Sequence, residues 1–336
     1  SFSTNFHTLD VMNAQESVDF LTNYYGEGSK AWNLLGWKKR DADGNPLKEF
    51  GTYDTDWQNE IYRTGVNHDH NITLQGGVQA EDKSVFAMPY RVSVGYTGQQ
   101  GILKGSDYKR LTASVNLNPS FLDNHLTFNM NGKFVKSWTK PGNGEAIGAA
   151  VGMDPTQPIM DMENPKFKNY GGYFQWVQEA EYGNPNWGYT HQQGPKNAVE
   201  LVNNYGFDKD AWVFMGNVDA AYKIHGLEDL SLHVNLAGEW TNGQENTYQS
   251  PYSMSGYYYG SYGWNTEEKH NLQLSALAAY DKEFNKNHSL NVMAGYEWSE
   301  FQYMGREKFW GYYPEGDRKY NADPAQNIYD PTGYPE

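Results

Sequence analysis

The segment from Asn271 to Ser299 constrains the fold of this chain more than any other. It holds two runs, residues 271–281 and 289–299, in which apolar and polar side chains alternate, joined by a short polar connection. Successive side chains of a β-strand point to opposite faces, so the alternation predicts an antiparallel hairpin with one apolar and one polar face. The apolar set is Leu272, Leu274, Ala276, Ala278, Tyr280, Leu290, Val292, Ala294, Tyr296 and Trp298.

The same alternation recurs along the chain and predicts about nine strands. The expected strands lie near residues 1–8, 67–78, 85–97, 108–120, 124–136, 211–224, 229–241, 268–283 and 288–304. Most are longer than the five or six residues usual in sheets, and they suit a tilted crossing of a hydrocarbon layer, which takes about 9 to 11 residues. Helical spacing of apolar side chains in residues 14–25 predicts a short helix in the first loop.

The connections between these strands alternate in length. Short turns are expected near 79–83, 121–125, 225–229 and 284–288, and long ones at 9–66, 98–107, 137–210 and 243–267. All long connections then lie at one end of the sheet, as in outer-membrane barrels, which have short periplasmic turns and long extracellular loops. Rings end several apolar runs, as Trp212, Tyr222 and Trp240 do, and suit an interfacial girdle. The predicted fold is all-β, an antiparallel transmembrane β-barrel portion.

Composition narrows the classes of function. The net charge of −15 argues against nucleic-acid binding, because a phosphate backbone requires a basic surface. The chain has no cysteine, which excludes disulfides and cysteine-based metal sites. The polar strand faces are rich in Asn, Ser, Thr, Gln and Gly, as expected of a wet lumen. The alternative is a soluble or surface-attached saccharide-binding or adhesion β protein without transport.

Residues 53–118 carry the most specific motifs in the chain. They contain Y-D-T-D-W-Q-N-E-I-Y-R-T from Tyr53, H-N-I-T-L-Q-G-G from His70 and Y-R-V-S-V-G-Y-T-G-Q-Q-G-I-L-K-G-S-D from Tyr90. This stretch closely resembles the SusC/RagA-type TonB-dependent transporters. The resemblance implies import of glycans or peptides across the bacterial outer membrane, with a SusD-type surface lipoprotein as partner and energy passed on by TonB.

The resemblance also sets an expectation for domain organisation. No TonB box, plug domain or terminal closing strand is recognisable, so residues 1–336 are expected to form an incomplete TonB-dependent receptor β-barrel domain. Contact with TonB is expected through regions absent from this chain, and contact with outer-membrane lipid through the apolar strand faces. A barrel in lipid must close, because an open strand edge leaves backbone groups unpaired.

Aromatic residues of the long loops are the candidate substrate-binding residues. Flat rings stack on sugar faces and on peptide side chains, while neighbouring amides take hydrogen bonds. The alternative is that these rings pack the loops against one another or against the lipoprotein. The candidates are Trp176, Trp187, Tyr189, Tyr257, Tyr258, Tyr259 and Trp264. Replacing Trp176 and Trp187 with alanine is expected to weaken substrate capture.

Other chemistry has little support in the sequence. Asp41, Asp43 and Asn45 alternate as in the start of a calcium loop, but Pro46 and Thr52 then break the pattern, so a solvated turn is the better interpretation. The run His68-Asp69-His70 suits a wet lumen or rim better than a metal site. No Gly-x-Ser-x-Gly elbow or phosphate loop occurs. We therefore expect no cofactor and no enzyme activity.

Overall fold

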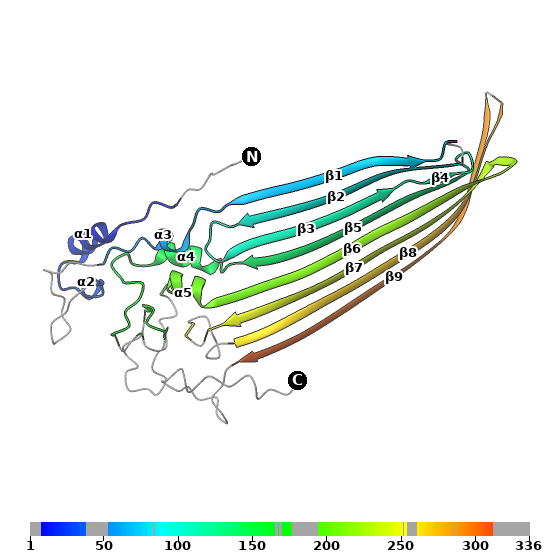
Figure 1. Cartoon of the computed structure of the whole chain (residues 1–336). Coiled ribbons are helices and arrows are strands. Elements are labelled where there is room, and N and C mark those ends of the chain that lie inside the picture. Colours follow the sequence, from blue (N-terminus) through cyan, green and yellow to red (C-terminus); the bar gives the residue numbers. More distant parts are fainter. Residues whose placement is uncertain are drawn as a thin grey trace.

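One large antiparallel sheet dominates the computed structural model of the chain (Figure 1). The structure describes residues 8–37, 53–82, 85–164, 167, 170–176, 194–250, 252–253, 261–285 and 287–311. The sheet has nine strands in the order β1-β2-β3-β5-β6-β7-β8-β9, and β4 pairs with β2 and β5. Neighbours in the sheet are therefore almost always neighbours in sequence.

The strand bounds confirm the all-β prediction. The strands are β1 Asn67–Gln79, β2 Phe86–Gln100, β3 Ser106–Leu117, β4 Ser120–Phe121, β5 Leu126–Pro141, β6 Tyr205–Ile224, β7 Leu227–Gln249, β8 Ser261–Asn285 and β9 His288–Gly311. Each strand expected between residues 67 and 304 overlaps one of these. The strand expected at 1–8 falls mainly outside the described residues, and Thr8 belongs to no strand.

Several strands continue into segments that we expected to be loops. β6, β7, β8 and β9 contain 20, 23, 25 and 24 residues. Asn242 pairs with Glu268 and Gln244 with Thr266, within the segment 243–267 or at its edges. The expectation was wrong because a ladder bonds backbone groups and does not need apolar side chains on one face. The connection expected at 98–107 likewise shrinks to 101–105.

One face of the sheet carries a continuous band of apolar side chains. Residues opposite one another in an antiparallel pair share a face, and the registers align Leu117, Met130, Val218, Leu236, Leu274 and Trp298 in one row. On β7 the apolar band runs from Leu230 to Trp240, which matches the about 9 to 11 residues of a membrane crossing. Its side chains are open to the surroundings, and Ile72 is 78% exposed.

A spin label at Leu274 should be reached by lipid-soluble oxygen and shielded from a water-soluble nickel reagent when the full-length protein is in a bilayer. Leu274 lies in the apolar band, whereas its neighbour Gln273 points to the other face. A label at Gln273 is the matched control and should show the reverse preference. Equal accessibility at the two positions, measured by power-saturation spectroscopy, would contradict the assignment of the two faces.

The helices gather at one end of the sheet, beside the long connections (Figure 1). They are α1 Ala14–Tyr25, α2 Lys30–Asn33, α3 Trp57–Ile61, α4 Glu145–Gly152 and α5 Ala198–Asn203. The helix predicted at 14–25 is confirmed, and it begins with a capping box in which Asn13 and Glu16 bond to each other's backbone N–H. None of the helices in the described ranges is long and apolar enough to cross a membrane.

Helices α3, α4 and α5 and the nearby loops enclose a hydrophobic core of their own, which we call the loop-cap core. It unites the segment before β1, the β2–β3 connection and the β5–β6 connection. Its members are Trp57, Ile61, Leu103, Ala146, Ala149, Ala150, Met153, Phe167, Phe174, Ala198 and Leu201. A second small cluster, Trp32, Leu35 and Trp37, packs against Val18 and Leu21 of α1. The described parts of the long connections therefore form packed structure over one end of the sheet, which we call the loop cap.

Candidate functional site: a polar hollow on the sheet

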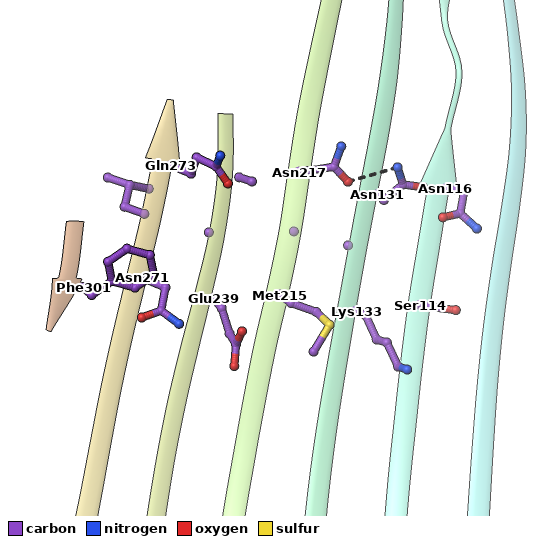
Figure 2. A pocket seen from close by; sticks show the side chains of 15 residues that line it. Ser114, Asn116, Asn131, Lys133, Met215, Asn217, Glu239, Asn271, Gln273 and Phe301 are labelled. Carbon is purple, nitrogen blue, oxygen red and sulfur yellow. Dashed lines mark hydrogen bonds between the residues drawn. The ribbon is translucent and has the colours of Figure 1, made fainter. Parts of the chain in front are cut away.

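The face opposite the apolar band contains a hollow of about 570 Å³ across β3 and β5 to β9 (Figure 2). Two neighbouring rows of side chains form it. The first, which we call the amide row, consists of Asn116, Asn131, Asn217, Ala237 and Gln273; the second consists of Ser114, Lys133, Met215, Glu239, Asn271 and Phe301. The strand registers alone bring these residues together, since they are far apart in sequence.

One hydrogen bond joins two members of the amide row, and two others connect the row to neighbouring polar side chains. The Asn131 Nδ2 donates to Asn217 Oδ1 at 3.1 Å and to Asn129 Oδ1 at 2.8 Å. At the other end of the row, Gln273 Nε2 donates to Glu297 Oε1 at 2.6 Å. A side-chain amide both donates and accepts, so the row presents both kinds of group to a ligand.

Two opposite charges flank the centre of the hollow. Lys133 and Glu239 lie directly opposite Met215 on the strands at either side, about 10 Å apart by two strand spacings. Glu239 accepts a hydrogen bond from Thr241 at 3.3 Å. In the described part of the chain, Lys133 makes no ion pair. The exposed ring of Phe301 completes the lining at β9, so the hollow combines amides, separated charges and an apolar ring.

A second hollow, of about 710 Å³, adjoins the first and shares Asn116 and Asn131 with it. Its other lining residues are Gln75, Gly76, Pro89, Tyr90, Arg91, Asn118 and Asn129. No histidine or cysteine is among the described residues that line either hollow. This lining suits reversible binding of a polar ligand.

The loop cap is tied to the sheet by Arg63. Its guanidinium donates to Asp107 Oδ1 at 3.0 Å, to the Ser106 carbonyl at 2.7 Å and to the Gly101 carbonyl at 3.1 Å. In the segment before α3, burial and then the charge of Asp161 raise the pKa of Tyr53 above its ordinary value. The bonds of Arg63 hold the loop cap at the end of β2 and β3 where the helices lie.

The histidines next to Asp69 lie at the rim of the apolar face. His68 and His70 have ring centroids 5.3 Å apart, and His68 stacks on Tyr96 at 5.6 Å. Asp69 points to the other face, where it accepts from Thr97 at 2.6 Å. Since the carboxylate and the imidazoles lie on opposite faces, they do not converge on one ion. The described residues contain no group of three potential metal ligands, and Asp41, Asp43 and Asn45 lie outside the described residues.

Of the candidate substrate-binding residues, two are described by the structure. Trp176 packs against the loop-cap core and meets Phe174 edge to face at 5.2 Å. Trp264 is in β8, opposite Asn246 and Lys308, so its assignment to a loop was wrong because the β7–β8 ladder continues through it. The others lie outside the described residues: Trp187, Tyr189, Tyr257, Tyr258 and Tyr259. Contact of these rings with substrate stays a prediction.

The amide row was missed as a candidate site when the sequence was read alone. Its signal is present, because Asn129 and Asn131 alternate on one expected strand and Asn116 and Asn118 alternate on another. Only the register shows that Asn116, Asn131 and Asn217 stand side by side. The periodicity of one strand does not specify its register against the next.

No protein-family model matches the sequence. The TonB-dependent receptor SusC of Bacteroides thetaiotaomicron is 37% identical to the chain over 318 residues, which is 93% of this chain and 29% of SusC. The chain resembles the SusC/RagA family along nearly its whole length. The resemblance of residues 53–118 is thereby confirmed and extends over most of the chain, which spans less than a third of the length of SusC.

Solved structures agree on the fold. The RagAB peptide transporter matches with a TM-score of 0.59 and 16% identity, over 89% of this chain and 33% of that chain. The RagAB peptide importer in its 'open-open' state matches with the same TM-score, identity and coverage. At this identity the likeness shows the fold, and the sheet is part of an antiparallel transmembrane β-barrel.

Proposed function

We propose that the chain forms the barrel wall and outward loops of an outer-membrane importer of glycans or peptides. The observation that carries the proposal is the contrast between the two faces, with an apolar band on one and an amide-lined hollow of about 570 Å³ on the other. A membrane conduit for polar nutrients needs both faces at once. SusC is named a TonB-dependent receptor and RagAB a peptide transporter, which supports the same function here.

Other parts of the transporter complete this function in the proposal. In the described sheet, β1 and β9 are edge strands that do not pair with each other, and such edges in lipid leave backbone groups unpaired. Further strands therefore close the barrel, and a plug fills it. A SusD-type lipoprotein covers the loop cap, TonB supplies energy through regions outside these residues, and the chain itself performs no catalysis.

The exposed apolar band disfavours a soluble saccharide-binding protein. In water, the side chains of Ile72, Leu74 and Phe214 would form part of a large continuous apolar surface, which soluble monomers rarely expose. In a bilayer the same surface faces hydrocarbon and requires no cover. The full-length protein should accordingly require detergent for extraction from the membrane fraction.

Uptake by cells tests the importer directly. In a strain that lacks the gene of the full-length receptor, growth on one class of nutrient, glycan or peptide, should be lost and restored by the wild-type gene. Wild-type growth on both classes in the deletion strain, or recovery of the receptor in the soluble fraction without detergent, would contradict the proposed function.

Replacing Asn131 and Asn217 together with alanine should lower the rate of nutrient uptake several-fold in the restored strain. The change removes the hydrogen-bonded centre of the amide row, and groups left without partners weaken ligand binding. The matched control is Asn242→Ala on β7, which lies on the opposite face. Immunoblots of outer membranes should show equal amounts of all variants. Equal uptake by the double variant would exclude the amide row from the pathway.

A further inference from the structure

An apolar hollow of about 320 Å³ lies on the lipid-facing side of the sheet, across β3 and β5 to β8. The glycines that it shares with the polar hollow of the opposite face are Gly132, Gly216 and Gly238. Its walls are side chains of the apolar band, among them Val115, Leu117, Met130, Phe214, Leu236 and Trp240. We call this site the glycine groove.

Three glycines on neighbouring strands form the floor of the groove. Gly132 of β5 lies opposite Gly216 of β6, which in turn lies opposite Gly238 of β7. The row belongs to the lipid-facing side, because Val115 and Leu272 of the apolar band continue it on β3 and β8. A glycine in a strand leaves room for close approach of another group. The apolar band therefore has a hollow in place of a row of side chains.

The groove lies in the half of the apolar band that is nearer the loop cap. On β7 the band runs from Leu230 to Trp240, and Gly238 is the last position before Trp240 on that face. The rings of Phe214 and Trp240 lie opposite each other, with centroids 5.8 Å apart, and border the groove on the cap side. The groove is thus at the depth of acyl chains of the leaflet on the cap side, the outer leaflet of the proposed orientation.

Three lysines surround one tryptophan on the same face, between the groove and the loop cap. Lys109 of β3 lies opposite Trp138 of β5, and Lys136 and Lys140 are two positions from Trp138 on either side along β5. The Lys136 Nζ lies 5.5 Å from the centre of the Trp138 ring, which is 39% exposed. Tryptophan rings and cations at the boundary of the hydrocarbon are typical of contact with anionic head groups. We call these four residues the lysine cluster.

The lysine cluster has a positive charge in excess. The three carboxylates on this face of β3 and β6 each have a cation of their own, in the pairs Arg63 with Asp107, Lys140 with Asp208 and Lys136 with Asp210. Within the part of the chain that the structure describes, Lys109 makes no ion pair. An ammonium has three donors, so paired lysines have donors to spare. The cluster therefore suits a phosphate group.

The groove and the lysine cluster are spaced for a single lipid. Gly132 and Lys136 are four positions apart on β5, about 13 Å at about 3.3 Å per residue. One leaflet contains about 15 Å of hydrocarbon, half of the usual core of about 30 Å. An acyl chain that begins at the lysines therefore reaches the glycines.

We propose that the glycine groove and the lysine cluster together bind one phosphate-bearing lipid of the outer leaflet. The phosphate lies among Lys109, Lys136 and Lys140, and an acyl chain fills the groove. A second copy of the chain would cover the apolar walls but would bring the same lysines and no phosphate. The inference depends on the assignment of the apolar band to lipid and not on the nutrient that the receptor imports.

Native mass spectrometry of the full-length receptor in detergent tests the site. The probes are monophosphoryl lipid A, the same lipid after enzymatic removal of its phosphate, and inorganic phosphate. We expect an adduct with monophosphoryl lipid A, a Kd at least about tenfold higher for the dephosphorylated lipid, and no competition by inorganic phosphate. Binding of both lipids with equal Kd, or no lipid adduct, would overturn the inference.

A substitution within the groove tests the seat of the acyl chain. Gly132→Leu fills the groove, and its Cβ would lie 3.2 Å from a Val115 methyl, which a small shift of that methyl relieves. The Kd of monophosphoryl lipid A should rise about tenfold. The control Ala294→Leu adds the same side chain to the band on β9, outside the groove, and should leave the Kd unchanged.

Loss of two lysines tests the phosphate contact. The double variant Lys109→Gln with Lys140→Gln should raise the Kd of monophosphoryl lipid A about tenfold and that of the dephosphorylated lipid far less. The matched control is Lys282→Gln. Lys282 lies on the same face near the short turns and pairs with Asp229 at 2.9 Å, as Lys140 pairs with Asp208 at 3.0 Å. It should leave both values unchanged.

Heat-modifiable mobility on a gel confirms that each variant retains its barrel. Lipid binding that neither Gly132→Leu nor the double lysine variant weakens would overturn the inference. So would a dimer without lipid in which Gly132→Leu restores the monomer, because the groove would then receive a second copy. None of these outcomes bears on nutrient import, which the uptake assay measures separately.

Discussion

Replacing Ile61 with alanine is expected to open the loop cap of the folded receptor while the barrel stays intact. Ile61 is 0% exposed and lies in the loop-cap core between α3 and the other connections. Removal of buried methyl groups in such a core costs about 2–5 kcal/mol, from lost transfer energy and the cavity left behind. A cap of this size has little stability in reserve, so its open population should rise by at least about tenfold.

Limited proteolysis of the full-length receptor in detergent measures this opening. At low protease concentration the cleavage rate follows the population of the open cap, so cuts within residues 53–66 and 142–164 should appear about tenfold faster in Ile61→Ala. Ile147→Ala is the matched control, because Ile147 lies on α4 beside the same core but is 42% exposed. Equal cleavage rates for Ile61→Ala and the wild type would show that the cap does not depend on this core.

The loop cap is the part of the fold that sequence patterns could not reveal. Helices α2, α3 and α5 contain 4, 5 and 6 residues, too few to show a helical period, whereas α1 has 12 residues and was predicted correctly. The loop-cap core also draws on Leu103 and Leu201, which are far apart in sequence. Local periodicity contains no information about such contacts.

Alternation of apolar and polar residues predicts the part of each strand that has one apolar face, but not its polar extension. Where one face meets lipid, as from Leu230 to Trp240, apolar residues recur at every second position and the strand is evident. Beyond Trp240 both faces of the strand are polar, so apolar and polar residues no longer alternate. The pairs Asn242 with Glu268 and Glu245 with Asn265 could therefore not be predicted from the sequence. The ladder continues there because backbone pairing does not depend on the side chains.

The prediction of binding residues was limited in the same way, because local sequence does not specify which loops contact each other. Aromatic composition drew attention to the long loops, but a ring can serve packing or binding, and Trp176 packs on the loop-cap core. Tyr173 and Tyr252 line one small hollow, because the β5–β6 and β7–β8 connections are joined by the bond from the Ser250 N–H to the Asn204 carbonyl. That geometry depends on two loops at once and has no signature in either alone.

Replacing Leu236 with arginine should destabilise the receptor by about 2–4 kcal/mol in a bilayer, the cost of a cationic side chain at the midplane of a barrel's lipid face. Leu236 lies in the middle of the apolar band, opposite Val218 and Leu274. No carboxylate stands opposite it on either neighbouring strand, so the guanidinium has no counter-charge within the band. The free energy of unfolding of the full-length receptor in lipid vesicles, from guanidinium titration followed by tryptophan fluorescence, measures the loss.

The neighbouring substitution Asn235→Arg separates the cost of burial in lipid from the cost of the larger side chain. Asn235 points to the polar face, where its amide donates to Asp219 at 3.5 Å, so an arginine there meets water and a carboxylate. We expect it to change the free energy of unfolding by less than about 1 kcal/mol, the usual range for a wet site. If the two variants lost equal stability, neither face would be buried in hydrocarbon. If Asn235→Arg were the costlier change, the faces would be reversed, and the amide row could not line a path for a polar nutrient.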